Sequence, residues 1–505
     1  MGVRSLVAMA FLLSGLCLCA QERDANAGRP ADVPPVVRSK VGQEAAAKDG
    51  SIRLRLSDKR LGYGSGEHFD AAIASPKSIS FSADGSKFYV NSLEGCRTVV
   101  YDSRTLEKLS VIDYNYTSGQ GDLWAPASGF YPFTHYPGGE KRAFRGKPVE
   151  STLTPDGSYL FVPFYRRTFD INAQDPSAMA VIDTRTDRVV RLFETGPIPK
   201  MVRVSGDGRL LAITHWGDNT VGFLDISSPD LRQWRHLKPV VVDHRHPLNY
   251  SLTEVRDRDT GSGYSLRGTL FLPGDSLLLV SGMGGAVAVI DVRRMQWLGW
   301  IPALFGVRHI VQGKNRVFFS QSFQGKVLSL PTDSILAAVG RTRQVGQVRQ
   351  FRVGGLKSVK VGGSVRTIEL SPSGRFLFAA CNRSSELYVI ATGSMEVLAV
   401  APVDSYPVGL DVSPDGSLVV VTSQGRKGFG GNAVNIFAVE YAEPEVVLAL
   451  PADTTSDSHV GTRPGASALR GQLPSAAVCS WLPWAIGGGV LLILLLAFLL
   501  VRRRR

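Results

Sequence analysis

A four-residue turn signature recurs along this chain and limits what the chain can fold into. Residues 413–416 read Ser-Pro-Asp-Gly between two apolar, β-branched runs. Proline at the second position presets φ, aspartate bonds back to the backbone and glycine takes a positive φ, so the tetrapeptide predicts a tight turn between strands. Valine at 419, 420 and 421 predicts a strand buried on both faces. One such sheet cannot bury both faces alone, so copies must stack on one another.

Six further copies of the turn, some of them degenerate, begin at Ser82, Thr154, Ser205, Leu272, Gly313 and Ser371. A short apolar strand follows each copy, and most copies then show a third strand that ends in a hydrophobe–Asp pair or its equivalent. A single β-sandwich would not repeat its turn in this way. Seven units of roughly forty residues or more, each with four short strands, predict an all-β fold: a seven-bladed β-propeller of four-stranded antiparallel blades.

The repeat also resembles a known family. The pattern of a turn, an apolar strand and a Val-Ile-Asp-Thr ending is clearest over residues 154–186 and 407–439, and it is similar to the YVTN-type β-propeller repeat. The resemblance covers about residues 76–450. It implies the propeller fold and little about function, because proteins with this repeat include surface-layer propellers, lactonase-like enzymes and haem-binding propellers.

The amino-terminal residues have the pattern of a secretory signal peptide over 1–27. Arg4 is followed by an apolar run over 6–18 and by Ala25-Asn26-Ala27 as a cleavage site, with Ala20 as a rival site. Residues 28–51 are polar and are predicted to be a flexible leader. We expect the propeller to occupy residues 52–450. The strand that closes its ring is either the alternating segment 52–56 or the segment 445–450, and the sequence leaves this choice open.

The carboxyl-terminal residues predict a membrane anchor. A polar linker over 451–480 precedes an apolar run over 481–501, which is long enough to span a bilayer. Trp481 and Trp484 suit an interfacial position, and the arginines at 502–505 predict a cytoplasmic tail. The prediction is one transmembrane helix that holds the propeller outside the cytoplasm, in the periplasm or at the cell surface. A sortase signal is the alternative, but residues 473–477 lack its Thr-Gly pair.

Charge and cysteine content exclude some classes of partner. The 57 cations and 44 anions give a net charge of +13, a mild bias without the dense basic stripe of a nucleic-acid-binding protein. Cys96 and Cys381 fall on blades that are not neighbours, so no disulfide is predicted between them. We therefore expect stacked blades to stabilise a monomeric propeller, with no nucleic acid among its partners.

The connections between strands predict one loop-rich face. In a four-stranded meander whose strands A to D run outward, the A–B and C–D turns lie on one face, and the B–C and D–A loops lie on the other. The long connections are 114–147, 166–177, 215–219, 244–265 and 423–432, and all of them fall on the second face, whereas the insertion over 331–342 falls on the first. Long loops on one face of a repeat protein indicate its binding surface.

Side chains on these loops are candidate ligand contacts. Eight aromatic residues lie within residues 114–147. They form either a cap or ligand surface over the channel, or a satellite core for the loop itself, and the sequence does not decide between the two. The candidates taken from the loops are Trp124, Tyr131, His135, Arg166, His215 and Trp216.

A second group of candidates comes from the innermost strands. When the seven turns are aligned, the first position of strand A is basic in five blades: Lys77, Lys200, Arg267, Arg308 and Arg366. Val149, followed by Glu150, and Val408 stand in the other two blades. A ring of like charge around a concave mouth focuses its field on an anion, although the bases could instead point into solvent.

Motifs for catalysis or metal binding are missing from the sequence. We find no Gly-x-Ser-x-Gly elbow, no Cys-x-x-Cys and no diagnostic histidine spacing, so we expect no cofactor and no metal. The leading hypothesis is a binding or scaffolding module for a cell-envelope protein or an anionic glycan. One alternative is a lactonase-like hydrolase, which would require His135, Glu150, His215 or His309 to converge at the mouth. The other is a purely structural envelope protein.

Overall fold

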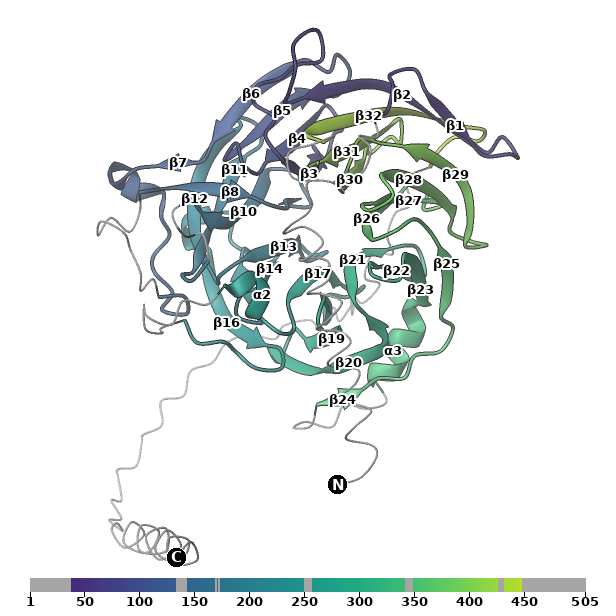
Figure 1. Ribbon diagram of the computed structural model, residues 1–505. Helices are drawn as coiled ribbons and strands as arrows, with labels where there is room; N and C mark the ends of the chain where they lie inside the picture. The colour runs from purple at the N-terminus through teal and green to yellow at the C-terminus, as the bar shows by residue number, and fades with distance from the viewer. Residues whose placement is uncertain are drawn as a thin grey trace, which may run out of the picture. The chain divides into compact units, whose positions relative to one another are not determined.

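Seven radial antiparallel sheets surround one axis in the computed structural model (Figure 1). The structure describes residues 38–132, 143–168, 170, 173–248, 257–340, 348–425 and 431–446. The all-β, seven-bladed β-propeller predicted from the turn repeat is confirmed. The predicted signal peptide, linker, transmembrane segment and basic tail lie outside the described residues, among which no helix is long and apolar enough to cross a membrane.

Blades 1 to 4 follow one another along the chain, each with its strands in the order A to D from the axis outward. Blade 1 contains β3 (Pro76–Phe81), β4 (Lys87–Ser92), β5 (Arg97–Asp102) and β6 (Lys108–Asp113); blade 2 contains β9 (Thr152–Leu153), β10 (Tyr159–Arg167), β11 (Ser177–Asp183) and β12 (Arg188–Thr195). Blade 3 contains β13 (Pro199–Val204), β14 (Leu210–His215), β15 (Thr220–Asp225) and β16 (Arg235–Val241); blade 4 contains β17 (Leu266–Phe271), β18 (Leu277–Gly282), β19 (Ala286–Asp291) and β20 (Gln296–Phe305).

Blades 5 to 7 complete the circle. Blade 5 contains β21 (Val307–Gln312), β22 (Arg316–Gln321), β23 (Lys326–Pro331) and β25 (Lys357–Lys360); blade 6 contains β26 (Val365–Leu370), β27 (Phe376–Cys381), β28 (Glu386–Ala391) and β29 (Glu396–Pro402). Blade 7 contains β30 (Pro407–Val412), β31 (Leu418–Ser423), β32 (Ala433–Tyr441) and β2 (Ile52–Leu61). Short additions are β1 (Glu44–Ala46), β7 (Asn115–Tyr116), β8 (Phe144–Pro148), β24 (Arg349–Gln350), the helices α2 (Arg258–Gly261) and α3 (Thr332–Gly340), and the 3₁₀ turns η2 (Ser118–Leu123) and η4 (Leu231–Gln233).

Apolar layers between neighbouring blades form the core. In β31, Val419 and Val421 pack toward blade 6, while Val420 packs with β32 toward blade 1. All three valines are fully buried, which confirms the two-sided burial that their sequence predicts. Cys96 and Cys381 are both buried and unpaired, as predicted.

The A–B turns form a second set of contacts between blades. Gly416 has a φ of +78°, and the Asp415 carboxylate accepts hydrogen bonds from Ser413 Oγ (2.5 Å) and Ser417 N (3.0 Å). A Cβ added to Gly85 would lie 3.2 Å from Cδ of Pro414, the proline of the neighbouring turn. Glycine therefore serves two purposes in this turn, because it permits the positive φ and also leaves room for the adjacent blade.

The amino-terminal strand closes the ring. β2 pairs antiparallel with β32 along its whole length, from Ile52 opposite Tyr441 to Leu61 opposite Ala433. Of the two segments that the sequence allowed as the closing strand, the one that begins at Ile52 therefore closes the ring. Glu445, from the rival segment, instead accepts hydrogen bonds from Ser373 N and the Arg375 side chain.

The predicted leader over 28–51 is ordered over its described part, which is a correction. Ser39 is buried and donates to Asn435 Oδ1 (2.9 Å), and Lys59 Nζ lies 2.5 Å from Asp404 Oδ2 and donates to Ser39 O. The next residues form β1, which pairs with β2. Polar residues in this segment, such as Ser39, form buried hydrogen bonds with the propeller. Composition alone cannot distinguish such residues from those of a flexible leader.

The connections are as asymmetric as the sequence predicts. The long described connections, before and after β7–β8 and between β16 and β17, join strand D to strand A and so lie on the loop-rich face. The insertion with α3 and β24 joins β23 to β25 on the turn face, as expected. Within the β7–β8 hairpin, Arg145 pairs with Asn115. The hairpin joins blade 2 through β8, in which Pro148 pairs with Phe164 of β10.

Candidate functional site

The five predicted bases occupy equivalent positions around the propeller axis. Each is the second residue of an innermost strand, β3, β13, β17, β21 or β26, and Figure 1 shows these strands gathered around the axis. We call Lys77, Lys200, Arg267, Arg308 and Arg366 the cation ring. The charges of Arg366, Arg267 and Lys200 act on the Lys77 ammonium, and so does the Glu150 carboxylate.

Hydrogen bonds from neighbouring blades fix the backbone of the cation ring. Thr214 Oγ1 of blade 3 donates to Arg267 O (2.6 Å), and Ser320 Oγ of blade 5 donates to Arg366 O (2.9 Å). In the same way, Thr367 Oγ1 of blade 6 donates to Val408 O (2.7 Å). The backbones of Arg267 and Arg366 are therefore held both by their own sheets and by the preceding blade.

Lys77 and Arg366 lack a balancing partner. Lys77 is 8% exposed, and Arg366 Nε is buried without a hydrogen-bond acceptor. Within the described residues neither side chain forms a hydrogen bond or an ion pair; the Arg366 guanidinium only lies 5.9 Å from the centre of the Tyr406 ring. Burial, reinforced by Arg366 and Arg267, holds the pKa of Lys77 well below its ordinary range. Burying such an unpaired base costs free energy unless an anion binds beside it.

Glu150 lies among the bases and pairs with one of them. Its Oε1 is 3.6 Å from an Arg267 guanidinium nitrogen, and both residues are buried. Burial raises the pKa of Glu150, although Arg267, Lys77 and Arg366 act to lower it. One carboxylate thus offsets one guanidinium and leaves the ring positive.

The Lys200 ammonium contacts two aromatic rings and a carboxylate on the loop-rich face. Its ammonium lies 4.0 Å from the centre of the Tyr165 ring and 4.8 Å from that of Trp216, and 3.8 Å from Asp259 Oδ1. Arg166 and the Tyr165 hydroxyl also bond to Asp259, and Trp216 Nε1 donates to its carbonyl (3.2 Å). Asp259 therefore neutralises the Lys200 side of the ring.

The buried Arg258 holds Asp259 in place. Its guanidinium donates to the carbonyl oxygens of Gln174 (3.1 Å), Gly217 (3.0 Å) and Pro247 (2.7 Å). These contacts tie α2, within the connection from blade 3 to blade 4, to loops of blades 2 and 3. The fifth base, Arg308, donates from Nε to Ser322 Oγ (3.1 Å) and lies close enough to influence Arg267.

Three of the predicted loop residues lie apart from the ring. Trp124 packs with Tyr116, Phe144 and other aromatic residues in a satellite core of blade 2. Tyr131 is buried against His215 and His236, and His215 Nε2 accepts from Gly196 N (3.1 Å). The insertion needs a core of its own, and Tyr114, Tyr116, Trp124 and Phe144 supply it. His135 lies outside the described residues.

A second layer of charged groups lies three residues further along the innermost strands, about 10 Å from the cation ring at 3.3 Å per residue. Glu369, Asp411 and Arg203 occupy the position that follows Arg366, Val408 and Lys200 by three. Burial, with the nearby Glu369 carboxylate, raises the pKa of Asp411 to about 7. Burial likewise raises the pKa of Glu369, and Arg203 opposes both shifts. We call Arg203, Glu369 and Asp411 the acid layer.

Sequence reasoning missed Asp259, Tyr165 and the acid layer. The turn alignment could have found Arg203, Glu369 and Asp411, because they share one position of strand A, as the bases do. Asp259 carries no such signal, because the connection that contains it is not part of the repeat.

The residues that would indicate a hydrolase have separate partners. His215 bonds to Gly196 N, Glu150 pairs with Arg267, and His309 Nδ1 lies 2.9 Å from Ile368 O. In the part of the chain that the structure describes, no group of three or more His, Cys, Asp or Glu side chains could hold a metal ion. His215, Glu150 and His309 thus bond to different groups and do not bond to one another.

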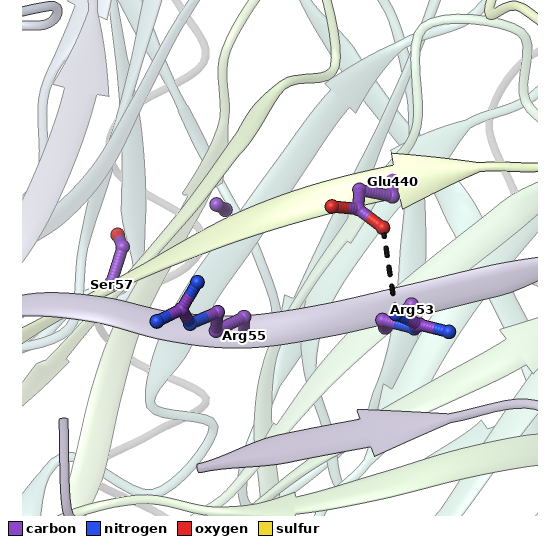
Figure 2. A pocket seen from close by; sticks show the side chains of 5 residues that line it. Arg53, Arg55, Ser57 and Glu440 are labelled. Atoms are coloured by element: carbon purple, nitrogen blue, oxygen red, sulfur yellow. Dashed lines mark ion pairs between the residues drawn. The ribbon is translucent and has the colours of Figure 1, made fainter. Parts of the chain in front are cut away.

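A surface groove lies away from this site, on the outer strands of blade 7. Figure 2 shows Arg53, Arg55 and Ser57 of β2 beside Glu440 of β32, and Ala438 completes the lining. The Arg53–Glu440 pair is 4.0 Å apart, with both side chains more than half exposed, so it contributes little. None of the predicted ligand contacts lines this groove.

Comparisons with known proteins add no family assignment. No protein-family model matches the chain, and no curated protein sequence matches it. Among solved structures, the hydrazine synthase of Kuenenia stuttgartiensis is 16% identical, with a TM-score of 0.48, and the match covers 74% of this chain and 98% of that chain. The β-propeller domain of Cps50 (Swd1) from Myceliophteria thermophila is 11% identical, with the same TM-score, and covers 76% and 100%. Likenesses this distant say nothing about function, and the strand pairing itself establishes the propeller.

Proposed function

We propose that the chain is a membrane-anchored, extracytoplasmic binding module of the YVTN-repeat type, which holds an anionic group of its ligand in the cation ring. The propeller supplies a rigid frame, and the loop-rich face supplies the entrance. The ligand would belong to a cell-envelope protein or to an anionic glycan.

The observation that carries this proposal is the state of Lys77. This side chain is more than nine-tenths buried, three other bases and the Glu150 carboxylate act on it, and it forms no hydrogen bond or ion pair with the described residues. Folding would not keep such a group for stability, because burying an unpaired base costs free energy. A bound anion would offset this free-energy cost, because the field of several bases attracts negative charge.

Membrane anchoring rests on the sequence. The apolar run over 481–501 between flanking tryptophans and four arginines supports one transmembrane helix, and the pattern over 1–27 supports secretion. Together they would place the ring where envelope components can reach it.

The test uses the full chain in detergent and follows thermal unfolding at constant ionic strength with acetate, polyglutamate and phosphate. We expect at least one anion to raise the Tm of the wild type and the double substitution Lys77→Gln, Arg366→Gln to remove that increase. The matched control is Arg104→Gln, Arg185→Gln, which removes two exposed bases from C–D turns on the other face. Protection that is absent from the wild type, or equal in the ring variant, would overturn the proposal.

A further inference from the structure

We infer that the cation ring takes a compact oxyanion with two negative charges, of the phosphate monoester or inorganic phosphate class, in preference to a singly charged group such as a carboxylate or a phosphodiester. This inference rests on the proposed anion site and adds the chemical class of its ligand.

The charges around the ring give the first argument. Arg267 is paired with Glu150, and Lys200 shares Asp259 with Arg166. Of the three ring bases that remain, Arg308 donates to Ser322 Oγ, whereas Lys77 and Arg366 have no hydrogen-bond or ion-pair partner within the described ranges. A ligand with one charge would leave one of these bases uncompensated, and a dianion would balance both.

The compactness of the ring gives the second argument. Arg366, Arg267 and Lys200 each influence Lys77, and Arg366 also influences Arg267. These bases also occupy the same position of innermost strands around one axis, so a compact group at the axis can face several of them at once. A phosphoryl group concentrates its charge on three oxygens around one atom, which suits several donors that converge from different blades.

The position of the internal carboxylates gives the third argument. Glu150 and Asp259 both lie on the side of blades 2 to 4, where they already satisfy the bases of blades 3 and 4. Lys77 and Arg366 come from blades 1 and 6, on either side of blade 7, which contributes Val408 and Gly409 at this level. The ligand group is therefore expected beside blade 7, bonded to Lys77 Nζ and to the Arg366 guanidinium.

The test compares ligands that differ by one charge. Isothermal titration of the full chain at pH 8 and constant ionic strength would use inorganic phosphate, glycerol 3-phosphate, dimethyl phosphate and acetate. We expect phosphate to bind at least tenfold more tightly than dimethyl phosphate or acetate. Similar binding of glycerol 3-phosphate would identify an esterified phosphate as the source, and binding of inorganic phosphate alone would identify the free ion; either outcome supports the inference.

Variants separate the inference from the proposed function. Lys77→Gln and Arg366→Gln each remove one unbalanced base, so each should reduce the preference for phosphate, whereas the control Arg104→Gln should keep it. Circular dichroism would check that each variant folds. Equal affinity for acetate, dimethyl phosphate and phosphate in the wild type would overturn this inference and leave the anion site standing. Failure of every anion to bind would overturn both.

Discussion

The two charged layers around the propeller axis both bury groups of like charge, and they differ in how that charge can be balanced. In the cation ring, Lys77 and Arg366 lie among other bases, and neither is paired with a carboxylate in the part of the chain that the structure describes. In the acid layer, Asp411 accepts from Phe81 N (2.8 Å) and Val412 N (2.9 Å), and burial together with the Glu369 carboxylate raises its pKa, so a proton on Asp411 would reduce the repulsion. The acid layer can balance itself with a proton from water. The cation ring would need an anion from outside, and this difference supports the proposed anion site at the ring.

The largest effect should come from removing the unbalanced bases. Without any added anion, Lys77→Gln with Arg366→Gln should raise the free energy of unfolding by about 1–3 kcal/mol, because two poorly compensated groups leave the interior. Urea unfolding of the full chain would measure this change, and added phosphate should reverse the order of wild type and variant. A variant that is less stable without phosphate would contradict the account of the ring.

A smaller effect should appear in the acid layer as the pH changes. The pKa of Asp411 is about 7 in the folded chain and near 4 when unfolded, so the folded state holds the proton more tightly. Its contribution to stability is thus fully present below about pH 4 and is lost as the pH rises toward 7. Glu369→Gln removes the neighbouring charge and keeps an oxygen for Leu370 N, so it should reduce that loss by on the order of 1–2 kcal/mol.

The readout for Glu369→Gln is the difference between variant and wild type in unfolding free energy from pH 4 to pH 8. His236 and His309 have folded pKa values lowered by burial to about 4 and about 3, so their contributions change in the opposite direction. Both histidines are unchanged in the variant, and the difference isolates the acid pair. Parallel pH curves for the two proteins would show that Glu369 and Asp411 do not share a proton.

The smallest effect should be a proton taken up by the ring when an anion binds. Burial holds the pKa of Lys77 well below its usual range, and a bound anion would raise it again. Phosphate binding should therefore take up a fraction of one proton and weaken as the pH rises. Titrations in buffers of different ionisation enthalpy would measure the uptake, which Lys77→Gln should abolish. Uptake that persists in this variant would point to another group.

The sequence was sufficient where the repeat carries the information. The Ser-Pro-Asp-Gly turns predicted the number of blades, and the alignment on those turns predicted that Lys77, Arg267 and Arg366 begin equivalent strands. The same alignment contains Glu369 and Asp411, but their meaning depends on burial and on each other, which a sequence does not show. The role of Asp259 could not be predicted from the sequence, because its loop is unique to one blade and is not part of the repeat. Trp124 and Tyr131 show that aromatic content cannot separate a ligand surface from a loop's own core.

The most direct measurement is the position of a heavy dianion in crystals of the full chain. Selenate is a tetrahedral oxyanion with two charges, and its selenium atom is located by anomalous scattering. We predict a selenium peak at the axis beside blade 7, with its oxygens within hydrogen-bonding distance of Lys77 Nζ and the Arg366 guanidinium. Selenate bound elsewhere on the propeller, with none in the cation ring, would contradict the account.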